Sequence, residues 1–195
     1  MSIRLPPVAD RPSASIPILL LTGPVGVGKS TVAGEAARLL REARIAHALV
    51  DLAHIGVCFP APTNDPWHER LAHRNLACMW SNFQKAGALR LLLCRVLEAR
   101  SLLRHVVRAV PGAEITVIRL RTPLPVLHER LRAREAGRDP QWYLDAATYL
   151  TEKMDRFPVE DYLIDNLDRP ADDVAGEALR LAGWLASANP RRSPV

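Results

Sequence analysis

Short apolar runs alternate with longer stretches of helical periodicity along this sequence. The strand-like runs lie at 16–22, 45–50, 89–94, 115–120 and 161–164. The helix-like stretches lie at 30–44, 67–85, 98–109, 125–136, 142–156 and 171–186. Because strands that alternate with helices build βαβ units, this order predicts an α/β protein with a central parallel sheet and helices on both of its faces.

The two ends of the chain differ in character from the region between them. Residues 1–14 contain three prolines and are predicted to form a flexible arm, and residues 188–195 are predicted to form a short tail. The alternating pattern fills the rest, which has a usual length for one domain. We therefore expect a single folded domain at 15–187.

The composition is that of a folded protein without covalent cross-links. Hydrophobic residues make up 48% of the 195 residues and charged residues 24%, which excludes disordered and fibrous classes. The three cysteines show no CxxC spacing, so neither a disulfide framework nor a zinc ribbon is expected. No apolar run is long enough to cross a bilayer, and no export signal is recognisable. The sequence therefore predicts a cytoplasmic protein with reduced thiols.

The basic residues are dominated by arginine. Only three lysines stand beside 23 arginines, and the net charge is +5. Arginines spread along a chain are typical of solvated helix faces or of clamps for a phosphorylated small molecule. Because the sequence shows no aromatic platform and no basic stripe, we do not expect nucleic acid as a partner.

One segment carries a specific motif. Residues 23–31 read Gly-Pro-Val-Gly-Val-Gly-Lys-Ser-Thr, which fits the pattern G-x-x-x-x-G-K-[ST]. The segment directly follows the first apolar run and directly precedes the first helical stretch, as a phosphate-binding loop requires. The residues predicted to bind a nucleotide are Gly23, Pro24, Val25, Gly26, Val27, Gly28, Lys29, Ser30 and Thr31.

The chemistry of this loop indicates ATP and Mg²⁺. Glycines without Cβ let backbone N–H groups converge on phosphates, and the following helix adds its positive N-terminal end. Lys29 is predicted to reach the β- and γ-phosphates, and the hydroxyl of Ser30 is predicted to bind Mg²⁺. Since lysine is rare in this chain, its presence at residue 29 suggests a site that needs a compact ammonium.

A carboxylate is predicted to face this loop. Asp51 follows the second strand-like run, and ligands of open parallel sheets bind outside the carboxyl ends of the strands. Asp51 is therefore a candidate to accept the proton of an attacking hydroxyl or to hold Mg²⁺ through water. The alternative is that Asp51 caps a helix and has no chemical role.

Several arginines follow the fourth strand-like run. Arg130 and Arg134 are four residues apart and share one helix face, and Arg138 follows in a Gly-Arg-Asp-Pro break. Such arginines can close over a transferring phosphoryl group and neutralise its charge, so all three are catalytic candidates. The alternative is a solvated helix face on which glutamates pair with these arginines.

Taken together, the loop at 23–31, Asp51 and the arginine-rich segment resemble the P-loop kinases of the nucleoside-monophosphate-kinase-like group. This group includes adenylylsulfate kinase, gluconate kinase, shikimate kinase and the chloramphenicol phosphotransferase. The resemblance implies a three-layer P-loop NTPase fold, a five-stranded parallel sheet of order 2-3-1-4-5, and an arginine-bearing lid at about 134–158. It also implies that Asp51 contacts the acceptor and that the loop after the last strand, with Arg169, contacts adenine.

The third strand-like run departs from a common P-loop pattern. It ends in Cys94 and Arg95, where many P-loop proteins carry the aspartate that anchors Mg²⁺. The motor and AAA families therefore fit poorly. Asp51 or Glu98 is predicted to serve the metal through water instead.

The leading hypothesis is an ATP-dependent kinase that transfers the γ-phosphate to a hydroxyl of a small-molecule acceptor. We expect the acceptor beside Asp51, the proline-rich stretch 60–66 and the start of the next helix. One alternative is an ATP-binding regulator or resistance factor without efficient transfer, because the third strand lacks an acid. A second alternative, suggested by the positive net charge, is a kinase that acts on nucleic-acid ends.

Overall fold

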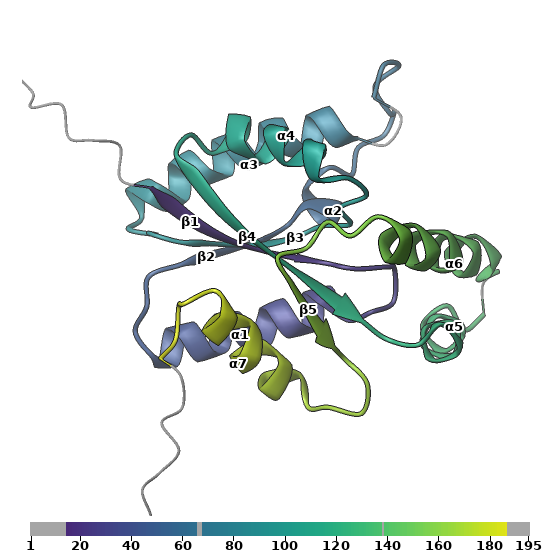
Figure 1. Ribbon diagram of the computed structural model, residues 1–195. Helices are drawn as coiled ribbons and strands as arrows, with labels where there is room; N and C mark the ends of the chain where they lie inside the picture. The colour runs from purple at the N-terminus through teal and green to yellow at the C-terminus, as the bar shows by residue number, and fades with distance from the viewer. Residues whose placement is uncertain (1–14, 66–67, 138, 187–195) are drawn as a thin grey trace, which may run out of the picture.

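A parallel sheet of five strands forms the centre of the molecule (Figure 1). The computed structural model describes residues 15–65, 68–137 and 139–186. The strands are β1 (Ile16–Thr22), β2 (Ala48–Asp51), β3 (Leu91–Cys94), β4 (Ala113–Arg121) and β5 (Tyr162–Asp165). Their order across the sheet is β2-β3-β1-β4-β5, which confirms the order that the resemblance implied. The arm expected at 1–14 and the tail expected at 188–195 both lie outside the described residues.

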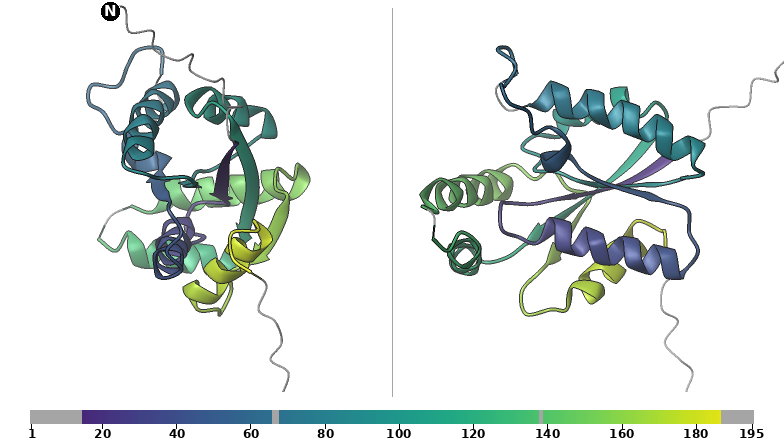
Figure 2. Two further views of the ribbon diagram at one scale, coloured as in Figure 1. Left: turned by 90° about the vertical axis from the view of Figure 1, so that its left-hand side faces the viewer. Right: turned by 180° about the vertical axis from the view of Figure 1, so that it is seen from behind.

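Helices cover both faces of this sheet. They are α1 (Lys29–Glu42), α2 (Leu52–Ile55), α3 (Glu69–Lys85), α4 (Leu103–Ala109), α5 (Leu124–Arg134), α6 (Gln141–Arg156) and α7 (Ala171–Leu181), with a 3-10 turn η1 (Arg100–Leu102) before α4. α1 and α7 pack together on one face, and α3 and α4 lie on the other (Figures 1 and 2). α5 and α6 pack against each other beyond the carboxyl end of the sheet. The predicted three-layer α/β fold is confirmed.

The central strand explains why the first apolar run is continuous. Leu19 and Leu21 of β1 belong to the core beneath α1 and α7, whereas Ile18 and Leu20 belong to the core beneath α3 and α4. Successive side chains of a strand point to opposite faces, so a strand covered on both sides needs apolar residues at every position. Within residues 15–65, 68–137 and 139–186, no helix combines the length and the apolar character needed to span a bilayer.

Several predicted boundaries differ from the structure. The helix expected at 98–109 begins only at Arg100, because Ala99 is extended, and it consists of the turn η1 followed by α4. The helix expected at 171–186 ends at Leu181, shortly before Gly183 adopts a positive φ of 69°. α2 was not predicted, because four residues are too few to show a helical period.

Candidate active site

The loop between β1 and α1 has a backbone conformation that favours glycine. Gly23 has φ 138° and Gly28 has φ 96°, values that side chains with a Cβ rarely adopt. A Cβ at residue 23 would lie 2.6 Å from the carbonyl oxygen of Leu120 in the neighbouring strand β4. Gly28 is the N-cap of α1, so the unpaired N–H groups in the first turn of α1 open onto the loop.

A residue from the far edge of the sheet fastens this loop. Asn166, which follows β5, donates from Nδ2 to the carbonyl oxygen of Val27 at 2.6 Å. A Cβ at Gly28 would lie 2.9 Å from the same nitrogen, so the contact depends on glycine at that position. Asn166 was not predicted as a site residue, since no local pattern links an asparagine after the last strand to a loop 139 positions earlier.

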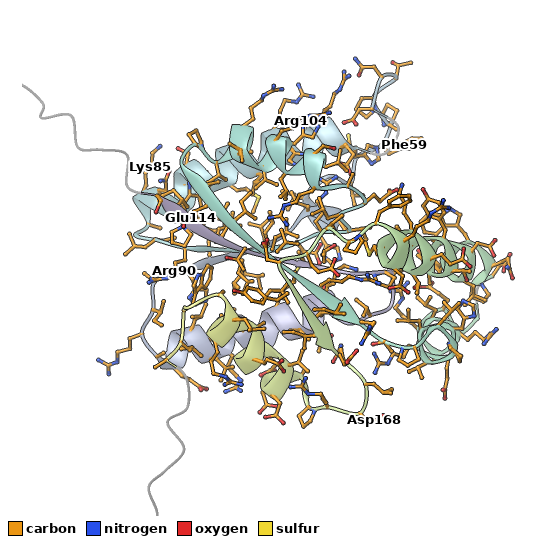
Figure 3. All side chains as sticks on the ribbon, viewed as in Figure 1. Phe59, Lys85, Arg90, Arg104, Glu114 and Asp168 are labelled. Carbon is orange, nitrogen blue, oxygen red and sulfur yellow. The ribbon has the colours of Figure 1, made fainter. Side chains whose placement is uncertain are left out.

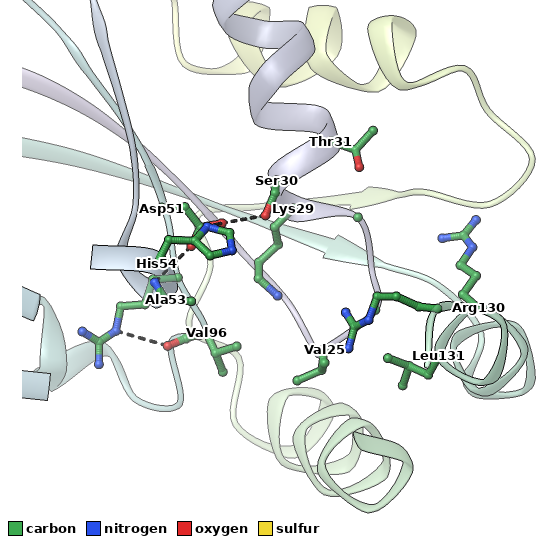
Figure 4. Close-up of a pocket in the computed structure, with 14 residues that line it drawn as sticks. Val25, Lys29, Ser30, Thr31, Asp51, Ala53, His54, Val96, Arg130 and Leu131 are labelled. Atoms are coloured by element: carbon green, nitrogen blue, oxygen red, sulfur yellow. Dashed lines mark hydrogen bonds and ion pairs between the residues drawn. The ribbon is translucent and has the colours of Figure 1, made fainter. Parts of the chain in front are cut away.

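Lys29 extends into the middle of the site (Figure 4). Its Nζ donates to the carbonyl oxygens of Gly23 and Pro24, each at 3.0 Å, which leaves one of its three N–H bonds for a ligand. Burial lowers the pKa of Lys29 from 10.5 to about 8, an effect that the carboxylate of Asp51 partly opposes. Phosphate oxygens beside Nζ would favour the charged form of this buried ammonium.

Ser30 and Asp51 meet where β2 ends. The hydroxyl of Ser30 donates to Oδ2 of Asp51 at 2.6 Å. Oδ1 of Asp51 accepts from the backbone N–H of Ala53 at 3.0 Å, so Asp51 is also the N-cap of α2. The helix cap that was considered as an alternative is therefore present. The cap leaves Asp51 able to accept further hydrogen bonds or to bind a cation, because each carboxylate oxygen retains a second lone pair.

A cavity of about 490 Å³ opens beside these residues. The predicted site residues that line it are Val25, Gly26, Gly28, Lys29, Ser30, Thr31, Asp51, Arg130 and Arg134. Its wall is completed by Ala53, His54, Arg95, Val96 and Leu131. Gly23, Pro24 and Val27 belong to the body of the loop and do not line the cavity. Figure 4 shows Lys29 between two walls, with Asp51 and His54 on one side and Arg130 of α5 on the other.

Arg130 and Arg134, the two described arginines among the catalytic candidates, line this cavity from α5. Arg130 donates from Nη2 to the carbonyl oxygen of Asn166 at 3.3 Å. Nε of Arg134 lies 2.8 Å from a carboxylate oxygen of Glu135, and its guanidinium lies 4.9 Å from the centre of the Tyr143 ring in α6. Arg138 lies outside the described residues. Arg130 and Arg134 therefore lie beside the phosphate loop, and Arg134 also has the glutamate partner that the alternative of a solvated helix face expected.

A second cavity of about 300 Å³ adjoins the first. Gly26, Gly28, Thr31 and Arg130 line both cavities, so the two spaces meet at the phosphate loop. Arg169 lines the second cavity. Its Nη1 donates to the carbonyl oxygen of Asp165 at 3.2 Å, and its Nη2 pairs with Glu177 at 2.6 Å. This is the side of the loop on which adenine was expected.

The end of β3 carries no acid. Cys94 lies opposite Asp51 in the register of β2 and β3, and its thiol donates to the carbonyl oxygen of Lys29 at 3.8 Å. Burial raises the pKa of Cys94 to about 12, so the thiol is neutral at pH 7. Glu98, the other carboxylate predicted to serve a metal, pairs with Lys153 at 2.7 Å and does not line the cavity. Of the two predicted carboxylates, Asp51 is the one beside the phosphate loop.

The oxygen donors at this position fit a hard cation bound together with phosphates. In the part of the chain that the structure describes, no three His, Cys, Asp or Glu side chains lie close enough to hold a metal by themselves. Mg²⁺ usually takes only one or two protein carboxylates and completes its shell with water and phosphate oxygens. The hydroxyl of Ser30 and the carboxylate of Asp51 match this donor set.

The proline-rich stretch expected beside the acceptor does not form the cavity wall where it is described. Phe59, the residue before it, is 98% exposed and lies on the outer surface (Figure 3). Residues 60–65 do not line the cavity, because α2 and the turn after it carry the chain outward. His54, Arg95 and Val96, from α2 and the segment after β3, form this wall instead.

Solved structures provide the comparison for this arrangement, since no family model and no curated protein sequence matches the chain. A tunicamycin resistance protein from Deinococcus radiodurans is 19% identical, with a TM-score of 0.62 over 87% of this chain and 97% of that chain. A gluconokinase from Sinorhizobium meliloti is 20% identical, with a TM-score of 0.57 over 89% and 93%. The Mycobacterium tuberculosis APS kinase, in complex with AMPPNP and APS, is 20% identical, with a TM-score of 0.55 over 87% and 99%.

The chain has the P-loop kinase fold. This confirms, at the level of the fold, the resemblance drawn from residues 23–31 and the segments that follow them. With identities near 20%, the likeness concerns the backbone architecture. In this P-loop kinase fold the two cavities lie at the carboxyl end of the sheet, where open parallel sheets bind their ligands.

Proposed function

We propose that this chain is an ATP-dependent phosphotransferase that transfers the γ-phosphoryl group to a hydroxyl of a small-molecule acceptor. The observation that carries the proposal is the hydrogen bond of 2.6 Å between Ser30 and Asp51 in the cavity that Lys29 also lines. It joins a phosphate-binding loop, a metal-binding hydroxyl and a candidate base in one space. The kinases among the solved structures of the same fold support it.

ATP is proposed to lie across the two adjoining cavities. The terminal phosphates would accept hydrogen bonds from the N–H groups that begin α1 and from the third N–H of Lys29, and adenine would lie toward Arg169. Ser30 would bind Mg²⁺ directly and Asp51 would bind it through water. The ion would neutralise charge on the phosphate oxygens.

Asp51 is proposed to take the proton of the acceptor hydroxyl as the hydroxyl oxygen bonds to the γ-phosphorus. The bond between that phosphorus and ADP breaks, and Arg130 and Arg134 donate to the oxygens of the transferring group. Arg138 stays a prediction. The segment at 134–158, which contains α6, is proposed as the lid over this reaction.

A second candidate function is an ATP-binding regulator or resistance factor without efficient transfer. The neutral thiol of Cys94 favours it, because it occupies the end of β3 where a metal-anchoring acid would strengthen catalysis. This candidate predicts ATP binding without ADP release on addition of any acceptor.

Release of ADP across a panel of hydroxylated metabolites tests both functions. We expect wild type to release ADP with at least one acceptor, Lys29→Ala to lose ATP binding, and Asp51→Asn to bind ATP but to lower kcat about 100-fold or more. Lys85→Ala, at the exposed end of α3, is the control and should match wild type. ATP binding without release for any acceptor favours the regulator, and a wild-type protein that does not bind ATP contradicts both functions.

A further inference from the structure

The helices α5 and α6 share a small core that is separate from the two cores of the sheet. Leu131 of α5 packs with Leu144 and Ala147 of α6, and Val25 of the phosphate loop packs against them. None of these four residues belongs to the core beneath α1 and α7 or to the core beneath α3 and α4. The phosphate loop is therefore in apolar contact with the pair of helices that carries the two candidate arginines.

Leu131 lies against the phosphate loop at Gly26. A Cβ at residue 26 would lie 2.9 Å from Cγ of Leu131 and 3.1 Å from its Cδ2, so the leucine would have to move to admit it. Leu131 is fully buried, although it borders the cavity. Figure 4 shows Leu131 beside Val25, on the side of the site that Arg130 lines. Leu131 thus occupies the space that glycine leaves open at residue 26.

The positions of Arg130 and Arg134 depend on where α5 lies relative to the phosphate loop. Arg134 pairs with Glu135 and lies over the ring of Tyr143, and both partners belong to the same segment of α5 and α6. Arg130 donates to the carbonyl oxygen of Asn166 at 3.3 Å, which is longer than a usual N–H···O hydrogen bond. The distance of the two guanidinium groups from bound phosphates is therefore set mainly by how α5 packs on the loop.

Leu131 makes this packing contact within one helical turn of both arginines. Leu127, one turn earlier on α5, packs into the core beneath α1 and α7 and does not line the cavity. Asp155, near the end of α6, pairs with the buried side chain of Arg119 in β4. Of these three attachments, the one through Leu131 is made to the phosphate loop itself.

We propose that Leu131 is a positioning residue for phosphoryl transfer, because its packing into the space at Gly26 sets the distance of Arg130 and Arg134 from the γ-phosphate. This inference rests on the proposed function. Groups that stabilise a transferring phosphoryl group act only when they are accurately placed, and a misplacement of about 1 Å can lower the rate about 100-fold. Gly26 provides the matching space on the side of the loop.

The position of α5 should affect transfer more than nucleotide binding. The phosphates are proposed to be held by Lys29 and by the N–H groups that begin α1, which belong to the loop and its helix. The two arginines are assigned to the charge that builds on the transferring group. A shift of α5 would therefore lower kcat and leave the affinity for ADP largely unchanged. A leucine that only filled a core would lower stability without this selective effect on kcat.

Truncation of Leu131 tests the proposal against a matched control on the same helix. Leu127 and Leu131 are both fully buried, so each change to alanine should lower Tm. We expect Leu131→Ala to lower kcat about 10- to 100-fold, with a Kd for ADP close to that of wild type. Leu127→Ala should keep the wild-type kcat at a temperature at which it is folded. Leu131→Met conserves the volume of the side chain and should recover most of the rate. The assay is ADP release with the most active acceptor of the hydroxylated-metabolite panel.

A double-mutant cycle tests the contact itself. In Gly26→Ala the new Cβ would displace Leu131, whereas in the Leu131→Ala background it has room. Gly26→Ala should therefore lower kcat by a smaller factor in that background than in wild type. Since the φ of Gly26 is 84°, the backbone strain of alanine is present in both backgrounds and cancels in the comparison.

The outcomes separate the role of Leu131 from the proposed function. A wild-type kcat in Leu131→Ala, an equal loss of kcat in Leu127→Ala, or the same factor for Gly26→Ala in both backgrounds overturns the role of Leu131 and leaves the proposed kinase standing. If Leu131→Ala does not fold, as judged by its Tm, Leu131→Val replaces it, with a lowered kcat expected for Leu131→Val and not for Leu131→Met. A wild-type protein that releases no ADP with any acceptor overturns the proposed function, and this inference with it.

Discussion

At the level of single residues, the charged groups of the site have partners that the fold supplies. Lys29 donates to two carbonyl oxygens of its own loop, and Asp51 accepts from a serine hydroxyl and a helix N–H. These hydrogen bonds leave one N–H of Lys29 and further lone pairs of Asp51 free for other partners. The same residues that stabilise the loop therefore retain hydrogen-bonding capacity for phosphate and metal.

The pKa of His73 predicts how stability depends on pH. Its folded pKa lies below the usual value of about 6.5, chiefly because of burial, and the groups that face it are Glu69, Arg95 and His105. As the pH falls below about 6.5, the unfolded chain takes up a proton that folded His73 does not, so stability falls. The loss levels off once the pH passes below the folded pKa.

Urea unfolding at pH 5 to 8 measures this effect. The midpoint should fall more steeply between pH 7 and pH 5 for wild type than for His73→Gln. His47→Gln provides the matched control, since His47 lies outside this cluster, and it should follow wild type. Parallel curves for wild type and His73→Gln would show that His73 does not take part in the pH dependence.

Gly23 offers a prediction about the backbone of the loop. In Gly23→Ala, the new Cβ would meet the carbonyl oxygen of Leu120 at 2.6 Å with φ at 138°, so we expect a loss of about 1–3 kcal/mol of stability and weaker ATP binding. Gly34→Ala, in α1 with nothing within 4 Å of the new Cβ, should instead gain up to about 1 kcal/mol. Thermal unfolding and ATP titration of both variants measure these changes. If Gly23→Ala has the stability and the ATP affinity of wild type, the backbone at residue 23 does not require glycine.

At the level of elements, Asn166 couples β5 to the phosphate loop. Asn166→Ala removes the donor to the buried carbonyl of Val27, which should cost about 1–3 kcal/mol of stability and lower the affinity for ATP. The control is Asn82→Ala, at the exposed end of α3, which should change neither quantity. Urea unfolding and calorimetric titration with ATP measure both effects. Unchanged affinity in Asn166→Ala would mean that the loop holds its shape without β5.

At the level of the whole molecule, local patterns predicted the elements and the phosphate loop because each depends on neighbouring residues. The run at 16–22 and the motif at 23–31 are contiguous, so periodicity and spacing were sufficient. Arg95 and His54 were not among the predicted site residues, and Asn166 was predicted only as part of the loop beside adenine. Their positions depend on contacts at the carboxyl end of the sheet between strands and helices that are far apart in sequence. Local sequence patterns do not predict such contacts.

For the same reason, the described part of the proline-rich stretch does not line the cavity. Residues 60–65 follow Asp51 closely in sequence, but α2 turns the chain away from the sheet before they begin. Arg95 reaches the cavity because β3 lies between β2 and β1 in the sheet. Closeness to Asp51 in the sequence did not predict which residues line the cavity on that side, whereas the order of the strands does account for them.

The most direct test of the account is a crystal structure with a non-hydrolysable ATP analogue and Mg²⁺. It should show the β- and γ-phosphates within hydrogen-bond distance of Lys29 Nζ and of the N–H groups that begin α1, with the metal on the hydroxyl of Ser30 and Asp51 in its water shell. A nucleotide bound elsewhere, or a metal that contacts neither Ser30 nor the water bound by Asp51, would contradict it.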